Sequence, residues 1–381
     1  MDMAERTLSI LHMLSYPWFT GPAEPVLALA RAQQGRGHRV VFACDTQRPG
    51  DLATKAEEQR IPVERRLALC SRSGPILLLR DILTLKRLWR EGEFDILHCH
   101  RSHDHSLAAL AQPRRPRARL VRTLHTERSL SKRRDFQLRR SHGLITVARR
   151  YREELLRRDL LPPERVIAVE GAVDAERFTP GDGERVRAEA GLAASAPTVL
   201  LMARMVAGRG HAELIDAFAE VQRRLPEARL LLAGRGPLEP ELRERVERRG
   251  LSAAVRFLGY RRDLAEVYRA ANVVALLAPG NDGTCRAALE GMACGRPLLV
   301  SDRGALPEIV RDGKTGRVVP AGDRDALAAA LAEMLSDRAG QDRMGAAARQ
   351  ETVERFTVER AADRVEELYR RILAETPEVC R

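Results

Sequence analysis

Short apolar segments rich in β-branched residues recur along the chain, each followed by a stretch with helical spacing, and this alternation constrains the fold more than any other feature. Strands that alternate with helices are typical of parallel sheets with helices on both faces. Because the alternation occurs twice, the sequence predicts an α/β protein with two doubly wound domains. The expected strands are residues 8–14, 40–43, 94–97, 120–124, 144–147 and 166–169 in the first half, and 198–203, 229–233, 255–258, 273–277, 297–300 and 316–319 in the second.

The stretch Phe-Thr-Pro-Gly-Asp-Gly at 178–183 separates the two sets of strands and has the glycine and proline content of a linker. We therefore place the first domain at residues 1–180 and the second at 181–355. The segment from residue 356 has helical spacing and is long enough to return to the first domain. Residues 356–381 are thus predicted to contain a helix that packs on the first domain.

The net charge of +12 is concentrated in one segment. Residues 1–180 carry 33 Lys and Arg against 22 Asp and Glu, and residues 101–150 alone hold 14 basic and 3 acidic side chains. A segregated basic patch suggests a polyanionic partner such as anionic lipid, a phosphorylated glycan or nucleic acid. The alternative is a set of solvated surface arginines in an arginine-rich protein.

Residues 74–90 place apolar side chains on one helical stripe bordered by basic residues, namely Leu78, Leu79, Ile82, Leu85 and Trp89. Such a stripe either packs on a sheet or, together with the basic stretch 111–140, contacts an anionic membrane. The chain has no run of about 18 apolar residues, so no membrane span is expected. Its six cysteines lack CxxC spacing and indicate reduced thiols in the cytoplasm, with a possible place at the inner face of the membrane.

The string "DILHCHRSHDH" brings four histidines close together in the sequence: His98, His100, His103 and His105. Imidazole is a common metal ligand, but Asp104 is the single acid among them, and the spacing does not match a metal motif. Histidines that line a cleft or the surface are the favoured interpretation. A further histidine, His125, directly follows the strand expected at 120–124.

Several expected strands end in residues that suit a bound anion. Gly21 precedes a helix, whose first N–H groups can bind an anion, although no GxGxxG dinucleotide motif is present. Arg204 and Arg209 follow the strand at 198–203 and precede another helix, so they suit a diphosphate or else are solvated loop residues. Gly234, after a third strand, would leave room for a flat ring or a ribose.

Two carboxylates stand eight positions apart in "NDGTCRAALEGMACGRP", residues 281–297. Asp282 lies where a helix is expected to start, and Glu290 lies in the apolar run Ala-Ala-Leu-Glu-Gly-Met-Ala. A buried carboxylate is costly unless it accepts hydrogen bonds. Glu290 therefore indicates either a ligand rich in hydroxyl groups or a charge required by the fold, and Asp282 either a ligand contact or a helix N-cap.

Four blocks of the second half, in order and spacing, resemble the retaining GT-B glycosyltransferases of the family 4 group. They lie within residues 195–350 and read "MARMVAGRGHAELIDAFAE", "LLLAGRGPLEPEL", "VRFLGYRRDLAEVYRAANVVALLAP" and "DGTCRAALEGMACGRPLLVSDRGALPEIVRDGKTGRVV". The first half is similar more loosely, through Gly21 and the strings "GRGHRV", "DILHCH", "TLH" and "GLITVARRY".

The resemblance implies two Rossmann-like domains that face a cleft, the first for the acceptor and the second for the donor, with the C-terminal helix crossing back to the first. It implies a glycosyltransferase that moves a sugar from a nucleotide-diphosphosugar to a glycan or lipid-linked acceptor that is anionic. The expected setting is cell-envelope polysaccharide or lipopolysaccharide synthesis. No metal and no cofactor besides the donor substrate is expected.

The resemblance also implies roles for the two carboxylates, which stand where the family has an E-x7-E pair, with Asp in the first position. Glu290 would accept hydrogen bonds from the ribose hydroxyls, and Asp282 would lie beside the donor sugar and its diphosphate. The backbone N–H groups of the following loop, Gly283, Thr284 and Cys285, would contact sugar hydroxyls.

The remaining implied roles concern charge and shape around the donor. Arg204 and Arg209 would stabilise the leaving diphosphate, with Arg209 where Lys is usual. His125 would contact the donor sugar from the first domain, and Gly21 and Gly234 would allow the donor to approach the backbone. Retention would follow from a same-face substitution in which a donor phosphate oxygen takes the proton of the acceptor hydroxyl, so no protein nucleophile is required.

Two other functions fit parts of the pattern. A nucleotide-sugar epimerase of the same fold would need further acids in the cleft, and the paired-carboxylate block argues against it. A non-catalytic polyanion-binding or nucleic-acid-binding protein would fit the basic segment. Only 4% of the residues are aromatic, however, and no stacking platform is evident, so no nucleic acid partner is expected.

Overall fold

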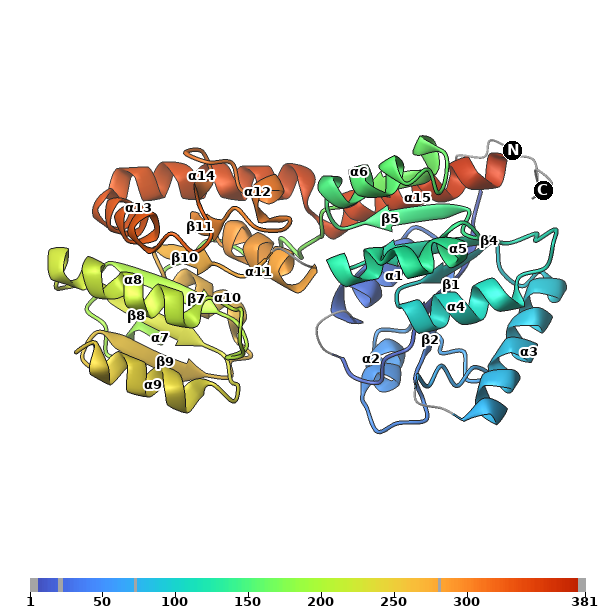
Figure 1. Ribbon diagram of the computed structural model, residues 1–381, viewed down its shortest axis with the longest axis horizontal. Coiled ribbons are helices and arrows are strands. Elements are labelled where there is room, and N and C mark those ends of the chain that lie inside the picture. Colours follow the sequence, from blue (N-terminus) through green and yellow to red (C-terminus); the bar gives the residue numbers. More distant parts are fainter. Residues whose placement is uncertain (1–5, 20–22, 72–73, 280–281, 376–381) are drawn as a thin grey trace. The chain divides into compact units, whose positions relative to one another are not determined.

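The computed structural model describes residues 6–19, 23–71, 74–279 and 282–375, without the side chains of 127–128 and 282–284, and it divides into two compact units (Figure 1). The first unit comprises Met1–Glu170 together with Val358–Arg381, and the second comprises Gly171–Thr357. The chain thus passes between the units at residues 170–171, where the sequence analysis placed the domain boundary at 180. It returns to the first unit at residue 358, close to the predicted 356.

The first unit is built on a six-stranded parallel sheet with the order β2-β1-β3-β4-β5-β6. Each strand coincides with one of the apolar segments expected in the first half. The strands are β1 (Ser9–Leu14), β2 (Arg39–Cys44), β3 (Ile96–Cys99), β4 (Arg119–Leu124), β5 (Gly143–Thr146) and β6 (Val166–Ala168).

Helices cover both faces of this sheet (Figure 1). Two segments far apart in the sequence, α1 and α15, pack with the same face, while α3 and α4 pack with the other. The helices are α1 (Ala23–Gly35), α2 (Leu52–Glu58), α3 (Pro75–Glu91), α4 (Ser102–Ala111), α5 (Asp135–Leu138), α6 (Arg149–Arg157) and α15 (Val358–Ala374), with 3-10 turns η1 (Glu127–Leu130), η2 (Lys132–Arg134) and η3 (Pro163–Arg165).

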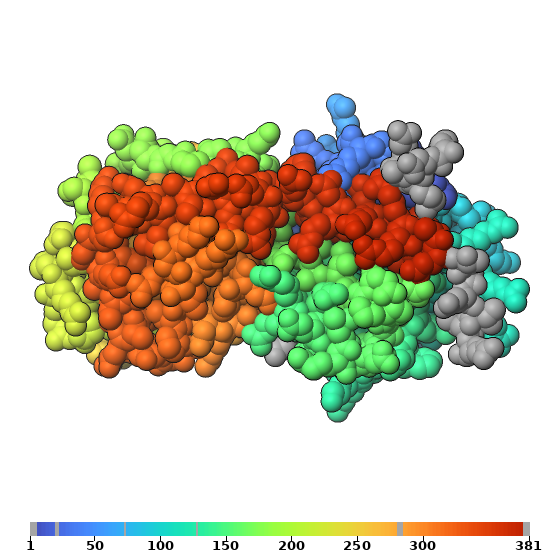
Figure 2. Space-filling view, turned by 90° about the horizontal axis from the view of Figure 1, so that it is seen from above, coloured from blue at the N-terminus to red at the C-terminus, as the bar shows by residue number. Residues whose placement is uncertain are grey.

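The C-terminal helix α15 completes the first unit, as the sequence predicted. Its fully buried Tyr369 packs in the core, and His38 lies 3.3 Å from the buried Glu366 carboxylate. At its end, Arg119 of β4 donates to the carbonyl of Ile372 over 2.8 Å. Figure 2 shows the outer surface of this helix, in deep red, beside the green segment that contains α6 and β6.

The second unit repeats the plan with a six-stranded parallel sheet in the order β12-β11-β10-β7-β8-β9. All six strands fall on the segments expected in the second half of the sequence. They are β7 (Thr198–Met202), β8 (Arg229–Ala233), β9 (Val255–Gly259), β10 (Val273–Leu276), β11 (Leu298–Ser301) and β12 (Gly316–Val319).

The core on one face of the second sheet is made with α8, α9 and α13, while α11 packs against α10, α12 and α14. The two units are therefore Rossmann-like domains, each with its own sheet and core. The helices are α7 (Glu184–Glu189), α8 (His211–Arg224), α9 (Glu239–Arg248), α10 (Leu264–Arg269), α11 (Asp282–Ala293), α12 (Leu306–Ile309), α13 (Arg324–Ser336) and α14 (Arg338–Arg355).

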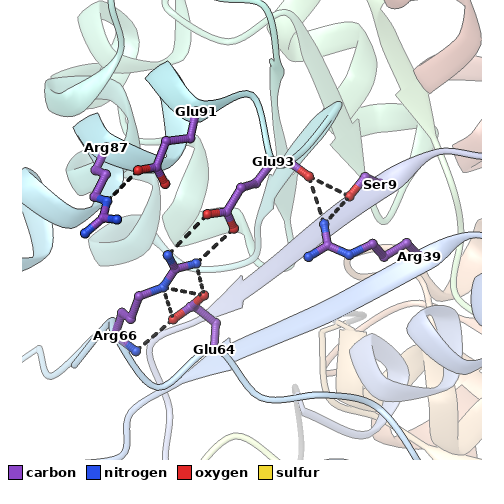
Figure 3. A network of polar contacts seen from close by, with 7 residues as sticks. All are labelled: Ser9, Arg39, Glu64, Arg66, Arg87, Glu91 and Glu93. Carbon is purple, nitrogen blue, oxygen red and sulfur yellow. Dashed lines mark hydrogen bonds and ion pairs between the residues drawn. The ribbon is translucent and has the colours of Figure 1, made fainter.

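A polar network fastens the end of α3 to the amino ends of β1 and β2 (Figure 3). The Arg66 guanidinium donates to the carboxylates of Glu64 and Glu93 over 2.7 and 2.9 Å, and this pairing lowers the pKa of Glu93. The backbone carbonyl of Glu93 accepts from Ser9 and from Arg39 over 2.8 and 2.9 Å. The network thus links the segment just after α3 to the first residues of β1 and β2.

The apolar stripe predicted on residues 74–90 is divided between core and surface. Leu85 and Trp89 are buried, as expected of a helix packed on a sheet. Leu78 and Leu79 are 37% and 57% exposed, and Leu83 nearby is 55% exposed. Of the helices in the part of the chain that the structure describes, none is long and apolar enough to cross a membrane.

Candidate functional site

The second sheet has a switch point between β7 and β10, where the strand order reverses. From β7 the chain proceeds to β8 and β9 on one side, and from β10 to β11 and β12 on the other. Loops at such a point diverge and open a crevice at the carboxyl ends of the strands, where parallel sheets bind ligands. The loop after β7 carries Arg204 and Arg209, and α11 begins after β10 at Asp282.

The two arginines lie on the short loop between β7 and α8. Arg204 is exposed and Arg209 is half-buried. Burial lowers the pKa of the Arg209 guanidinium, and the positive charge of Arg204 lowers it further. Two cations held near each other beside the N-terminus of a 14-residue helix make a region of positive potential that suits a diphosphate.

Glycines bring the neighbouring loops into direct contact with the β7 loop. Gly210, with φ of 85°, is so close to Leu277 that an added Cβ would lie 2.5 Å from the Leu277 Cβ. Gly234 adopts a φ of 134°, and a Cβ there would overlap the carbonyl oxygen of Ala203. The space that the sequence analysis assigned to a ring or ribose at Gly234 is therefore used by the β7 loop.

Glu290 lies on α11 and is 4% exposed. The buried Tyr268 of α10 donates its hydroxyl hydrogen to Glu290 Oε2 over 2.9 Å, and Arg286 Nε lies 3.5 Å from Oε1. Burial and then the Glu290 charge raise the pKa of Tyr268, so this hydroxyl remains a donor. A carboxylate offers about four acceptor positions, so one held by Tyr268 can still accept from a vicinal diol.

The residues between the two carboxylates belong to a helix. Gly283, Thr284 and Cys285 lie in the first turn of α11, so the expectation of a loop there is wrong. The first backbone N–H groups of a helix have no acceptor within the helix. The N–H groups of these three residues can therefore still donate hydrogen bonds to a ligand, as was expected of a loop. The side chains of Asp282 and Thr284 lie outside what the structure describes, while Cys285 is fully buried.

Asp282 and Glu290 both belong to α11, eight residues apart. At ~1.5 Å per residue, their Cα atoms are separated by ~12 Å along the helix axis. Two groups on one ligand, rather than one shared atom, would be needed to contact both residues.

In the first unit, His125 follows β4 at the carboxyl edge of the sheet. Its Nε2 lies 3.3 Å from Nδ1 of His100, which follows β3. Nε2 of His100 in turn lies 3.0 Å from Nδ1 of His12 on β1. Gly21, the other expected site residue of this domain, lies outside the described residues.

The four-histidine stretch divides in the structure. His98 and His100 lie on and just after β3, whereas His103 and His105 lie on α4. With His12, the first pair forms a group whose ring nitrogens approach within 4.8 Å of one another. The sequence analysis did not single out His12, although an imidazole within an apolar strand is itself a sign of a buried polar contact.

Hydrogen bonds account for every ring nitrogen of this group. His98 contacts the hydroxyls of Tyr369 and Thr123, each over 2.6 Å. His12 contacts Gln33 Oε1 over 2.8 Å besides its contact with His100. Burial lowers the pKa of all three rings, for His12 to about 4, so they are neutral at pH 7. A metal ion would have to displace these bonds.

Asp104 fixes the loops at the same edge of the sheet. This buried carboxylate accepts from the backbone N–H groups of His100 and Arg101, both over 3.0 Å, and from the Ser15 hydroxyl over 3.2 Å. It therefore ties the loop after β1 to the loop after β3. The sequence analysis noted Asp104 only as the one acid among the histidines.

Two family models match the chain, one in each half. The family described as "Glycosyl transferases group 1" matches residues 182–351, and the family described as "Glycosyltransferase Family 4" matches residues 20–177. The two matched regions follow the two units of the structure.

Known relatives match over nearly the full length. The phosphatidyl-myo-inositol mannosyltransferase of Mycobacterium leprae is 30% identical over 366 residues, 92% of each chain. The alpha-D-kanosaminyltransferase of Streptomyces kanamyceticus is 27% identical over 91% of this chain and 98% of its own. The crystal structure of Anabaena HepE in complex with UDP and glucose has a TM-score of 0.76 at 21% identity, covering 94% of this chain and 98% of that one.

The matched families, the relatives and the two Rossmann-like domains agree with the resemblance found in the sequence. The chain belongs to the family 4 glycosyltransferases of GT-B fold and is a nucleotide-sugar-dependent glycosyltransferase.

Proposed function

We propose that this enzyme transfers a sugar from a nucleotide-diphosphosugar to a lipid-linked or glycan acceptor of negative charge, with retention of the anomeric configuration. The proposed setting is polysaccharide or lipopolysaccharide synthesis for the cell envelope, at the cytoplasmic face of the membrane. The observation that carries the proposal is the switch point between β7 and β10 of the second sheet: the loop after β7 carries Arg204 and Arg209, and the helix α11 that follows β10 carries the buried, hydrogen-bonded Glu290.

In the proposed donor site, hydrogen bonds hold the ribose and positive charges hold the diphosphate. Glu290, oriented by Tyr268, accepts from the ribose hydroxyls. Arg204, Arg209 and the N-terminus of α8 stabilise the diphosphate as the glycosidic bond breaks, and preorganised positive charge makes a metal ion unnecessary. Asp282 and the first turn of α11 lie beside the sugar.

In the proposed mechanism the diphosphate departs from the anomeric carbon while the acceptor oxygen attacks from the same face. A donor phosphate oxygen takes the acceptor proton, so both atoms and charge balance without a protein nucleophile. The role of the arginines is greatest in the transition state, when negative charge accumulates on the leaving group.

Two observations support a lipid-linked, anionic acceptor. The mycobacterial relative is named for an acceptor that is a phospholipid, phosphatidyl-myo-inositol. In this chain, α3 exposes Ile76, Leu79 and Leu83, at 83%, 57% and 55%. These positions are three and four residues apart and so lie on one face of the helix.

Basic side chains lie on the same helix as this exposed face. Arg80, Lys86, Arg87 and Arg90 are exposed on α3, and the stretch 111–140 carries further exposed cations as well as Phe136, which is 76% exposed. An apolar face bordered by cations suits the surface of an anionic bilayer, where each nearby cation contributes ~1 kcal/mol.

The donor site is tested by thermal unfolding of wild type and Glu290→Ala with UDP, GDP, ADP and their sugar conjugates. A ligand at 100 times its Kd adds ~2.7 kcal/mol of stability. We expect one nucleotide class to stabilise wild type but not Glu290→Ala. Glu247→Ala, which removes an exposed acid from α9, is the matched control and keeps the response. If Glu290→Ala responds as wild type does, the ribose is not bound there.

The membrane contact is tested by sedimentation with phosphatidylglycerol vesicles at low salt. Burying one leucine is worth ~1.5–3 kcal/mol, so Leu79→Asp with Leu83→Asp should reduce vesicle binding at least ~10-fold. Val353→Asp, at a 44% exposed valine of the second unit, is the control and should bind normally. Equal binding of all three proteins would remove α3 from the proposal.

A further inference from the structure

A cavity opens at the amino-terminal edge of the second sheet, opposite the edge that carries the candidate donor site. Ala271 and Asn272, which directly precede β10, line this cavity, as does Arg296, two residues before β11. Because the strands are parallel, the four residues of β10 separate the two edges by ~13 Å. The volume of the cavity is about 420 Å3, within the range of pockets that bind small molecules.

Arginines from four separate elements line this cavity. They come from α7, from the end of α10, from the loop before β11 and from the start of α14, and they are Arg187, Arg269, Arg296 and Arg338. The acidic side chains of the lining are those of Asp182 and Glu184, and both residues are exposed. The fold therefore gathers a surplus of positive charge in one place, which suits an anion.

Arg187 is a buried cation held by carbonyl groups. It is 9% exposed, and its guanidinium donates to the backbone carbonyls of Ala193, Ala196 and Ala270, each over 2.8 Å. Among the described residues, no carboxylate forms an ion pair with it. Burial lowers the pKa of Arg187, and the charge of Arg338 lowers it further. Since a buried charge is costly without a counter-charge, an anion in the cavity would stabilise Arg187.

Two further arginines of the lining also lack an ion pair within the part of the chain that the structure describes. Burial lowers the pKa of Arg296, and the charges of Arg187 and Arg269 act in the same direction, while that of Asp342 opposes them. Arg338 is exposed and is the first residue of α14, where the helix dipole disfavours a cation. The repulsion among these guanidinium groups would be relieved by an anion that they share.

We propose that this cavity binds the phosphate group of a small phosphorylated molecule, with Arg296 and Arg338 donating to its oxygens and the buried charge of Arg187 supporting them. Guanidinium groups present paired N–H donors that match phosphate oxygens. A phosphate ester carries a charge of about −1.5 to −2 near pH 7. The site is separate from the donor site and does not depend on the proposed function.

The probe is inorganic phosphate, followed by phosphorus NMR at pH 7.5 and constant ionic strength. The starting protein carries Arg204→Ala and Arg209→Ala, so that the candidate diphosphate site does not bind the probe. We expect saturable broadening of the phosphate resonance. Adding Arg338→Ala or Arg296→Ala should weaken binding about tenfold, because each removes a charge-assisted donor. Arg224→Ala, at an exposed arginine that ends α8, is the matched control and should leave binding unchanged.

Urea unfolding separates a binding role of Arg338 from a structural one. Without phosphate, Arg338→Ala removes a repelling charge, so its unfolding midpoint should equal or exceed that of the starting protein. With phosphate, the midpoint of the starting protein should rise, and that of Arg338→Ala should rise less. A lower midpoint of Arg338→Ala without phosphate would mean a structural role and would count against the inference.

Two outcomes distinguish this site from the donor site. Equal phosphate binding by the starting protein, by Arg338→Ala and by Arg296→Ala would overturn the inference. Binding by wild type that disappears in the starting protein would place the phosphate at Arg204 and Arg209, which would support the proposed donor site and refute a second one.

Discussion

Replacing His105 by glutamine should make the first unit less sensitive to acid. His105 is 2% exposed on α4, and its Nε2 lies 2.8 Å from the Ser141 hydroxyl. Burial lowers its pKa to about 3, with smaller contributions from the charges of Arg122 and Arg134. Glutamine places an amide near the Nε2 position, so the contact with Ser141 is kept while the titrating group is removed.

The magnitude follows from linkage between protonation and folding. Below pH 6.5 the unfolded chain protonates His105 and the folded protein does not, so the free energy of unfolding falls as the pH falls from 6.5 towards 3. Between pH 7.5 and 5.0 a single such group costs ~2 kcal/mol. The buried His12, His98, His100 and His142 act in the same direction, but they are present in both proteins and cancel in the comparison.

Tryptophan fluorescence during urea unfolding isolates the first unit, because Trp18 and Trp89, the two tryptophans of the chain, both belong to it. The free energy of unfolding is measured for both proteins at pH 7.5 and 5.0. Wild type should lose ~2 kcal/mol more than His105→Gln between the two values. Equal losses would mean that His105 titrates normally in the folded protein, and the argument from burial would fail.

Three other substitutions test the geometry of the sites. Tyr268→Phe removes the donor to Glu290 and should weaken nucleotide binding about fivefold, as measured by calorimetry with the nucleotide found in the thermal screen. Gly234→Ala should destabilise the second unit by at least ~2 kcal/mol in thermal unfolding, because its Cβ would overlap the Ala203 carbonyl; unchanged stability would show that the two loops separate easily. Asp104→Ala leaves the backbone N–H groups of His100 and Arg101 without the oxygen that accepts from both and should cost ~1–3 kcal/mol in urea unfolding, whereas unchanged stability would mean that the two N–H groups find other acceptors.

The strands could be predicted from the sequence because a buried parallel strand needs a continuous apolar run. Twelve such runs coincide with the twelve strands of the described residues. The order of the strands within each sheet could not be predicted in this way, since it depends on which helix packs on which face. The position of β7 between β10 and β8 creates the switch point, and no local pattern of residues 198–202 contains that information.

The candidate site was predicted in part, and the missing part consists of contacts between residues distant in the sequence. Glu290 was noticed because a carboxylate is unusual in an apolar helix, but Tyr268, its hydrogen-bond donor, lies 22 residues away on another helix. The contact between His12 and His100 spans 88 residues and exists only because β1 and β3 are neighbours in the sheet. Residue type reveals that a buried polar group needs a partner, whereas the fold decides which partner it has.

Glu290 and His125 illustrate how these buried contacts relate to function. In each case a polar side chain is held from inside the domain, Glu290 by Tyr268 over 2.9 Å and His125 by His100 over 3.3 Å. An internal partner reduces the rotamer freedom that a ligand would otherwise have to restrict on binding. It also sets which atom donates and which accepts, since the Tyr268 hydroxyl donates and the Glu290 oxygen accepts. A substitution at Tyr268 should therefore impair the enzyme through the orientation of Glu290, and recovery by a variant that restores only the hydrogen-bonding atom distinguishes this effect from loss of packing.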